Sequence, residues 1–255
     1  MVYFILLVCV ALLALLAYVA HKVRRIHLAS SAVLEEASTA RREAAALFDQ
    51  LHALSSLERL LALPQSLPPM RGWAASPDLL LHLTQLLRER QPLCVVECSS
   101  GVSTVVAARC MELNGRGHVY SLEHDPVYAA KTISLLQRYG LTDWATVVLA
   151  PLQPVEGASA PDATEWYSHQ ALPADIPPIE VLVVDGPPAG GNSTARYPAL
   201  GKLAPRMAAD VTVLLDDADR LGERAVVDRW LAEHPGLRLE RLAAEKGLAK
   251  LSGRP

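Results

Sequence analysis

The sequence predicts an α/β protein with a doubly wound, mostly parallel seven-stranded sheet, preceded by a transmembrane helix and a helical stalk. Three observations support this. Short apolar strands alternate with helical segments from about residue 70 onward, polar residues follow the strands, and residues 2–20 carry no charge. With 20% charged and 51% hydrophobic residues, the 255-residue chain is not disordered. Its net charge of −3 argues against nucleic acid as a partner.

The first 20 residues predict a membrane anchor. Residues 2–20 form a run of 19 uncharged, mainly apolar residues, which as a helix is about long enough to span a bilayer. A cleaved signal peptide is the competing interpretation, but only Met1 precedes the run and the cleavage site is poor. The basic segment 21–25 follows directly, so we expect a single-pass membrane protein with a cytoplasmic large domain.

Residues 21–69 are expected to form a helical stalk and a proline-rich linker. Seven apolar residues recur at spacings of four and three, the pattern of a coiled-coil seam. These seam positions are Val33, Ala37, Ala40, Ala44, Leu47, Leu51 and Leu54. A homodimer through this stalk and a helix that lies on its own domain explain the pattern equally well. Pro64 and Pro68 then end the helix.

Residues 70–255 are expected to form one domain of alternating helices and strands. The predicted helices are 77–90, 103–114, 126–139, 196–207 and 223–234, and the predicted strands are 93–97, 118–123, 145–150, 179–184, 211–215, 237–242 and 248–251. Ser76 and Pro77 are typical of a helix start, and Gly115 and Gly140 of helix ends. The uniformly apolar strand 179–184 reads as buried on both faces.

Ligands of such sheets bind beyond the carboxyl ends of the strands. Polar side chains follow four of the predicted strands. They lie at Glu97 and in the turn 98–104, at Glu123 and His124, at Asp185, and at Asp216 and Asp217. One acid at a strand end carries little information, because such ends are solvated. Acids at four strand ends indicate a binding site.

The segments VVECSSGVST and IEVLVVDGPP, with Glu123 placed 22 residues beyond Gly101, resemble class I S-adenosylmethionine-dependent methyltransferases. The resemblance covers about 71–251 and implies a Rossmann-like fold that uses S-adenosylmethionine. A turn of small residues would approach the cofactor closely, and Glu123 would accept its ribose hydroxyls. The implied cofactor-binding residues are Glu97, Ser99, Ser100, Gly101, Ser103, Thr104, Glu123, His124 and Asp185. In the family, glycine commonly stands at the position of Ser99.

Asp185, His124 and His169 are the candidate catalytic bases, and Asp185 is the best placed. Together with Asp216 and Asp217, Asp185 resembles the Mg²⁺ site of some small O-methyltransferases, in which asparagine takes the second position of the pair. The alternative is that Asp185 contacts cofactor or substrate while Asp216 and Asp217 cap the next helix. We favour this alternative without a metal, because the family's basic partner beside strand four is missing.

The excursion 152–178 between two strands contains acids but neither lysine nor arginine, and it includes the pair Trp166-Tyr167. Its length and position predict a lid over the substrate.

The resulting hypothesis is O-methylation of a small-molecule or lipid-linked acceptor at the cytoplasmic face of a membrane. A catalytically silent, membrane-tethered scaffold or cofactor-binding protein is the first alternative. An NAD-type Rossmann enzyme is a weaker one, because ECSSGVST lacks two glycines of the dinucleotide motif.

Overall fold

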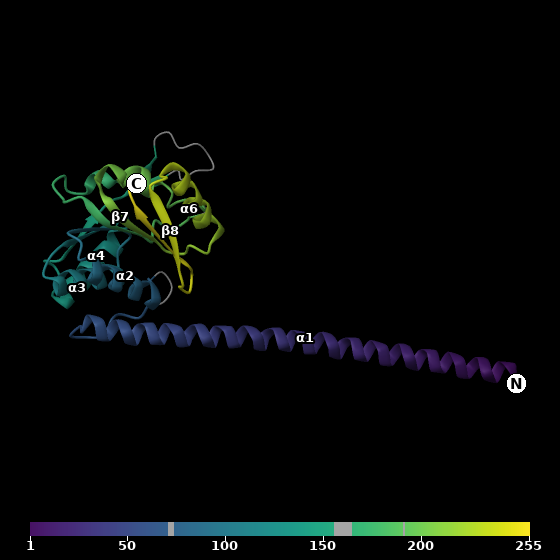
Figure 1. Ribbon diagram of the computed structural model, residues 1–255. Coiled ribbons are helices and arrows are strands. Elements are labelled where there is room, and N and C mark those ends of the chain that lie inside the picture. The colour runs from purple at the N-terminus through teal and green to yellow at the C-terminus, as the bar shows by residue number, and fades with distance from the viewer. Residues whose placement is uncertain (71–73, 156–164, 191) are drawn as a thin grey trace. The chain divides into compact units, whose positions relative to one another are not determined.

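The computed structural model describes residues 1–70, 74–155, 165–190 and 192–255 (Figure 1). Within the N-terminal helix, the side chains of residues 2–11, 14 and 17, and of several residues between 28 and 43, lie outside this description. The chain divides into two compact units, residues 1–49 and residues 50–255. The second unit holds the sheet and the candidate site.

Helix α1, Val2–Leu61, runs without interruption through the predicted anchor and most of the predicted stalk. No helix in the described part of the chain is long and apolar enough to cross a membrane. Most side chains of the predicted anchor, however, lie outside the described residues. The seam positions from Val33 to Leu51 are exposed.

The last turns of α1 belong to the domain. Ala53, Leu57 and Leu61 are spaced four residues apart and are buried, and Leu57 and Leu61 lie in a core cluster of the domain. Nε of Arg109 donates to the carbonyl oxygen of Leu61 at 2.8 Å, which satisfies one of the free carbonyls at the helix end. Residues 50–61 therefore lie on their own domain, and the compact unit begins before the predicted boundary at residue 70.

The main sheet has seven strands in the order β3-β2-β1-β6-β7-β9-β8, and only β9 runs antiparallel to its neighbours. The strands are β1 Cys94–Cys98, β2 His118–Glu123, β3 Ala145–Leu149, β6 Ile179–Val184, β7 Met207–Leu215, β8 Leu237–Leu242 and β9 Leu248–Gly253. The predicted mostly parallel seven-stranded sheet is confirmed. The strand order reverses between β1 and β6, so their carboxyl ends flank the crevice where such folds bind ligands.

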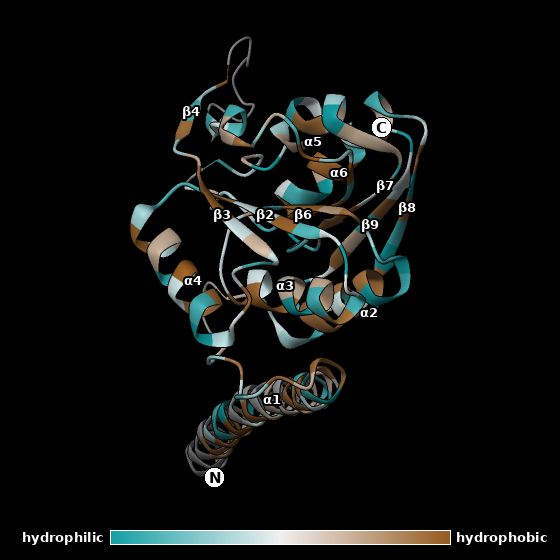
Figure 2. Cartoon of the chain, turned by 90° about the vertical axis from the view of Figure 1, so that its left-hand side faces the viewer, coloured by the Kyte–Doolittle hydropathy of each residue, from teal (hydrophilic) through white to brown (hydrophobic). Residues whose placement is uncertain are grey.

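Helices cover both faces of this sheet (Figure 2). Helices α2 Pro77–Arg90, α3 Val102–Asn114 and α4 Pro126–Tyr139 lie on one face, and α5 Pro198–Leu203 and α6 Leu221–Glu233 lie on the other. Each face has its own cluster of buried apolar side chains. The predicted bounds of α2, α4, β2, β6 and β8 match the structure.

The predicted helix 196–207 is wrong at both ends. The α-helix covers only Pro198–Leu203, a short 3₁₀ helix follows at Ala204–Arg206, and β7 begins at Met207 instead of residue 211. Met207 pairs with Ile179 of β6, and an irregularity in register follows before Val181 pairs with Thr212. Tertiary pairing with β6 therefore extends the strand into a segment that sequence periodicity assigns to a helix.

The excursion after β3 contains a hairpin of two short strands. Strand β4, Leu152–Pro154, pairs in antiparallel register with β5, Glu165–Tyr167. A short 3₁₀ helix, His169–Ala171, follows. Residues 156–164, which form much of the predicted lid, lie outside the described residues. Trp166 and Tyr167 are each only 2% exposed and join the core cluster beneath α5 and α6.

Candidate active site

The turn after β1 lies against the ends of two neighbouring strands. The amide of Ser99 donates to the carbonyl oxygen of Leu122 in β2 at 3.1 Å, and the amide of Asp185 donates to the carbonyl oxygen of Cys98 at 3.2 Å. Ser99 has φ 126°, a conformation that favours glycine. The backbone at Ser99 therefore adopts a conformation that glycine takes up freely and that serine accepts with strain.

Glu97 is the acid at the end of β1. Its side chain is buried, and Oε2 accepts hydrogen bonds from the hydroxyls of Thr104 at 2.7 Å and Ser121 at 2.6 Å. Burial raises the pKa of Glu97, and the hydroxyl donors oppose that shift. The other oxygen, Oε1, is buried without a partner among the described residues. One carboxylate oxygen therefore stays available to a polar ligand.

Glu123 ends β2 and is 5% exposed. Its Oε2 accepts a hydrogen bond from Oγ of Ser100 at 2.9 Å, and its Oε1 accepts one from the amide of Asp125 at 3.0 Å. Oγ of Ser100 also bonds Thr132, which fixes the hydroxyl between α4 and Glu123. The carboxylate is thus held in place at the end of the strand.

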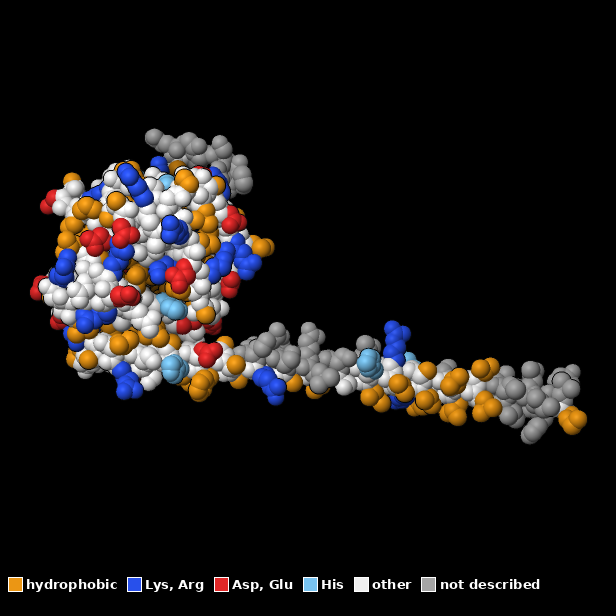
Figure 3. All heavy atoms as spheres, in the orientation of Figure 1, with side chains coloured by type: hydrophobic (Ala, Val, Ile, Leu, Met, Phe, Trp, Pro, Cys, Tyr) orange, Lys and Arg blue, Asp and Glu red, His pale blue; other side chains and the backbone are white. Residues whose placement is uncertain are grey.

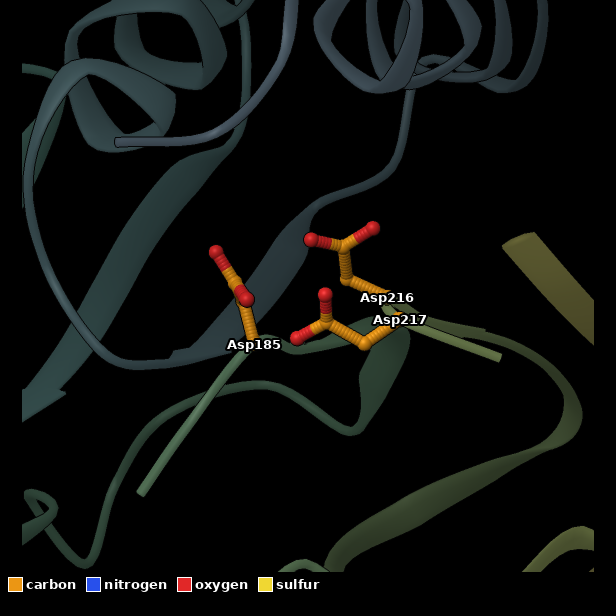
Figure 4. Close-up of side chains that lie close together, drawn as sticks. All are labelled: Asp185, Asp216 and Asp217. Carbon is orange, nitrogen blue, oxygen red and sulfur yellow. The ribbon is translucent and has the colours of Figure 1, made fainter. Parts of the chain in front are cut away.

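Three aspartates gather at the ends of β6 and β7. One carboxylate oxygen each from Asp185, Asp216 and Asp217 lies within 4.8 Å of the others, and the three side chains converge (Figure 4). Burial, followed by the nearby charge of Asp216, raises the pKa of Asp185 well above its usual range. Burial and the charge of Asp217 likewise raise the pKa of Asp216. Oδ1 of Asp216 and Oδ1 of Asp217 are buried without a partner in the described chain.

A buried arginine lies among these acids. Nη2 of Arg196 donates to Oδ2 of Asp217 at 2.8 Å and lies 3.4 Å from Oδ1 of Asp185. Nη1 donates to the backbone oxygen of Asp216 at 2.8 Å and lies 3.8 Å from Glu223. The expectation that no basic partner accompanies Asp185 is therefore wrong. Arg196 follows β6 by a loop, where no periodicity or motif distinguishes it from a surface arginine.

The proposed capping role of Asp216 and Asp217 is also wrong. Helix α6 begins at Leu221, and its N-cap position is Arg220, with no side-chain cap. Oδ2 of Asp217 instead lies 2.9 Å from Arg220 and binds Arg196. The cluster is therefore a set of buried carboxylates balanced by guanidinium groups.

The oxygen atoms of the three aspartates suit Mg²⁺ only in part. Carboxylate oxygens are the ligands that Mg²⁺ prefers, and two unpartnered oxygens are available at Asp216 and Asp217. The guanidinium of Arg196, however, already contacts two of the three carboxylates from within hydrogen-bond or ion-pair distance. The carboxylate oxygens therefore fit a divalent cation, but the guanidinium of Arg196 already supplies a positive charge to the same cluster.

The remaining predicted site residues divide into two groups. Gly101, Ser103 and Thr104 lie with Glu97 at the β1 turn, where the amide of Gly101 donates to Oγ1 of Thr104 at 3.0 Å. His124 lies beside Glu123, with Nδ1 3.1 Å from Oε1. His169 stands apart, because the charged groups that act on it are Lys202 and Arg206. Burial lowers the pKa of His169 first, and those cations lower it further.

Tyr167, like Arg196, lies at the site although the sequence analysis did not assign it there. A Cβ built on Gly186 would lie 2.4 Å from Oη of Tyr167 and 3.1 Å from the carbonyl oxygen of Cys98. The phenol therefore touches the backbone just after Asp185, beside the β1 turn. The sequence signal was the Trp166-Tyr167 pair alone, which does not reveal where its hairpin lies.

The comparisons with known proteins agree with this geometry. Residues 96–218 match the family model described as a methyltransferase domain, which spans β1 to the acids after β7. Among curated proteins, no sequence matches the chain. The matched segment holds Glu97, Glu123, Asp185 and Arg196, so the site described above lies inside the methyltransferase-like region.

Solved structures show the same fold. Cofactor-bound Rv0187 from MTB is similar with a TM-score of 0.55 and 21% identity, covering 82% of this chain and 89% of that chain. The O-methyltransferase from Bacillus cereus, in complex with SAH, has a TM-score of 0.52 and 18% identity over 79% of this chain and 90% of its own. The O-methyltransferase TomG from Streptomyces achromogenes, in complex with SAM, has a TM-score of 0.52 and 16% identity over 80% and 90%. At these identities the likeness establishes the fold.

Proposed function

We propose that the chain is an S-adenosylmethionine-dependent methyltransferase that methylates an oxygen atom of a small-molecule or lipid-linked acceptor. The observation that carries this proposal is Glu123, held by Ser100 and Asp125 at the end of β2 beside a turn of small residues. An acid in that position accepts ribose hydroxyls in related sheets. The unpartnered, buried oxygens of Glu97 and the aspartates at the same edge support a polar ligand there.

S-adenosylmethionine, when bound, supplies an activated methyl group to a nucleophile. The chain's own contribution is to hold both reactants in line and to remove the acceptor's proton. Asp185 is the proposed base, because it ends β6 at the candidate site and burial raises its pKa, which makes the carboxylate a stronger proton acceptor. Arg196 holds Asp185 and Asp217 in place and balances their charge.

Calorimetric titration of the full chain in mild detergent with S-adenosylmethionine tests the proposal. We expect binding to the wild type and clear weakening in Glu123→Ala, because the ribose hydroxyls lose their acceptor. Glu240→Gln, an exposed acid paired with Lys250, is the matched control. Failure of the wild type to bind would contradict the proposal. Binding of NAD instead would favour the dinucleotide alternative, and binding without methyl transfer to any acceptor in a cell extract would favour the silent scaffold.

A chelator tests the role of a metal separately. We expect methyl transfer to proceed equally with EDTA and with added Mg²⁺, because Arg196 supplies positive charge to the aspartates. A loss of activity in EDTA that Mg²⁺ restores would assign the three aspartates to a magnesium site instead.

The tether to the cytoplasmic face of a membrane is the second part of the proposal. It rests on the uncharged run 2–20 and the basic segment 21–25. Leu12, Leu13, Leu15 and Leu16 are each more than half exposed along the helix, and such a run is unfavourable in water. Hydrophobic side chains, in orange, line the described part of this helix (Figure 3). We expect the chain to stay in the membrane fraction after a carbonate wash and to resist proteases applied outside the cell. Recovery of the chain in the soluble fraction would contradict the proposed membrane tether.

A homodimer through the stalk is proposed for residues 33–51. Val33, Leu47 and Leu51 are more than half exposed at their seam positions, where a second helix can cover them. We expect light scattering in detergent to report a dimer that Leu47→Glu abolishes. Ala45→Glu, at an exposed position outside the pattern, is the control and leaves the mass unchanged. A monomeric wild type would contradict this proposal.

A further inference from the structure

Tyr167 places a buried hydroxyl in the middle of the candidate site. It stands in β5, where it pairs with Leu152 of β4, and its side chain is 2% exposed. Oη is buried and has no hydrogen-bond partner among the described residues. A hydroxyl in this state loses its bonds to water and gains nothing in return, so phenylalanine would be the more stable residue unless something else bonds the oxygen.

The surroundings of Gly186 locate this oxygen beside the β1 turn. A Cβ at Gly186 would lie 2.4 Å from Oη, 3.1 Å from the carbonyl oxygen of Cys98 and 3.1 Å from Cβ of Ser99. The phenol, the β1 turn and the backbone after Asp185 therefore meet at one point. This point lies where the strand order reverses, between β1 and β6.

The surroundings of the phenol are rich in acceptors. Burial raises the pKa of Tyr167 first, and the nearby charges of Glu123 and Asp185 raise it further, with Arg196 opposing them. The ring of His124 is 6.0 Å away in an edge-to-face arrangement. A ligand group that fits between carboxylates, a carbonyl oxygen and a phenolic oxygen carries positive charge.

We propose that Tyr167 is a positioning residue whose hydroxyl accepts a contact from the positively charged methionine part of bound S-adenosylmethionine. This inference rests on the proposed function and extends it to the hairpin β4–β5, which none of the cofactor-binding motifs includes. The hydroxyl then finds its missing partner in the ligand, and the destabilisation it causes in the free protein is offset on binding.

Tyr167→Phe separates this role from packing, since it removes one oxygen and keeps the ring. We expect the free variant to melt at the same temperature as the wild type or higher, and its affinity for S-adenosylmethionine to fall roughly 10-fold. Tyr128→Phe, at a half-exposed tyrosine on α4, is the matched control and changes neither value. A packing role alone would leave the affinity unchanged, and wild-type affinity in Tyr167→Phe would overturn the inference.

Titration with S-adenosylhomocysteine identifies the contacted group, because that product keeps the ammonium and lacks the sulfonium. Equal weakening of both ligands in Tyr167→Phe supports contact with the ammonium, and weakening of S-adenosylmethionine alone supports contact with the sulfonium. If the wild type binds neither ligand, the proposed function fails and this inference with it. If the wild type binds and Tyr167→Phe binds equally well, only this inference fails.

Gly186→Ala provides a second test, first alone and then combined with Tyr167→Phe. The new Cβ would push the phenolic oxygen out of place, so affinity for S-adenosylmethionine should fall. In the Tyr167→Phe background the same substitution should cost less affinity, because no hydroxyl remains to be displaced. Strict additivity of the two substitutions would overturn the inference.

Discussion

The two sides of the candidate site hold their acids in different ways. At the ends of β1 and β2, Glu97 and Glu123 are bonded by neutral hydroxyls and an amide. At the ends of β6 and β7, the guanidinium of Arg196 contacts the carboxylates of Asp185 and Asp217 and the backbone oxygen of Asp216. A hydroxyl can turn to a new partner when a ligand arrives, whereas a guanidinium keeps its charge and its planar set of donors. The hydroxyls of the first side can therefore exchange hydrogen-bond partners, whereas Arg196 on the second side keeps compensating the charge of the aspartates.

The largest effect is expected on the second side. Arg196→Met leaves Asp185, Asp217 and Glu223 buried without their cation, so the free energy of unfolding should fall by about 3–5 kcal/mol. Urea denaturation measures it. Arg224→Met, which removes a half-exposed arginine paired with Asp219, should change stability by less than about 0.5 kcal/mol. A similarly small effect of Arg196→Met would show that the aspartates are not held by this charge.

The next effect belongs to the first side. Glu123→Gln replaces an acceptor-only carboxylate by an amide, so one ribose hydroxyl meets an N–H group instead of an oxygen. We expect the affinity for S-adenosylmethionine to fall by about 1.5–3 kcal/mol in a calorimetric titration, with little change in folding stability. If Glu123→Gln destabilises the fold as strongly as Arg196→Met does, the proposed difference between the two sides of the site is contradicted.

A smaller effect concerns the pH dependence of the aspartate side. Burial raises the folded-state pKa of Asp185 above its usual value near 3.8, so its ionisation opposes folding. The wild type should therefore lose stability as the pH rises from about 4 through that raised pKa. Asp185→Asn stays neutral and should lose less stability, by up to about 1.4 kcal/mol for each unit by which the pKa of Asp185 is raised.

Denaturation curves at about pH 4 and about pH 8 measure this difference. Asp175→Asn, at an exposed position, is the control and should follow the wild type. Identical pH profiles for the wild type and Asp185→Asn would show that Arg196 alone compensates the buried carboxylate.

The smallest effect is expected at the turn itself. Ser99→Gly should raise the free energy of unfolding by about 1 kcal/mol, because glycine adopts φ 126° without strain. Ser168→Gly, where φ is −65°, should have the opposite sign, since glycine there only adds freedom to the unfolded chain. Thermal melting of both variants tests the pair. Destabilisation by Ser99→Gly would mean that the serine side chain, and not the backbone, determines this position.

The sequence predicts the first side of the site better than the second. The acids Glu97 and Glu123 end apolar strands whose bounds are marked by turns, so periodicity places them at the same edge of the sheet. Arg196 and Tyr167 lie in loops and a short hairpin, where position depends on tertiary contacts and not on spacing. Their roles emerge only once β6, β7 and the hairpin are folded together. The end of the predicted helix 196–207 fails for the same reason, since pairing with β6 decides it.

The buried leucines at the end of α1, Leu57 and Leu61, determine where the chain can be cut to give a separate, folded domain. The proline-rich segment 64–69 looks like a natural place for a protease to separate stalk and domain. Leu57 and Leu61, however, lie on the far side of that segment and fill the domain's core, and Arg109 bonds the helix end. A cut within 64–69 would therefore leave two fragments that remain associated. A recombinant domain started after those prolines would lack Leu57 and Leu61 and expose the apolar side chains that pack against them, so we expect it to aggregate. A domain started at or before Gln50 would keep both leucines.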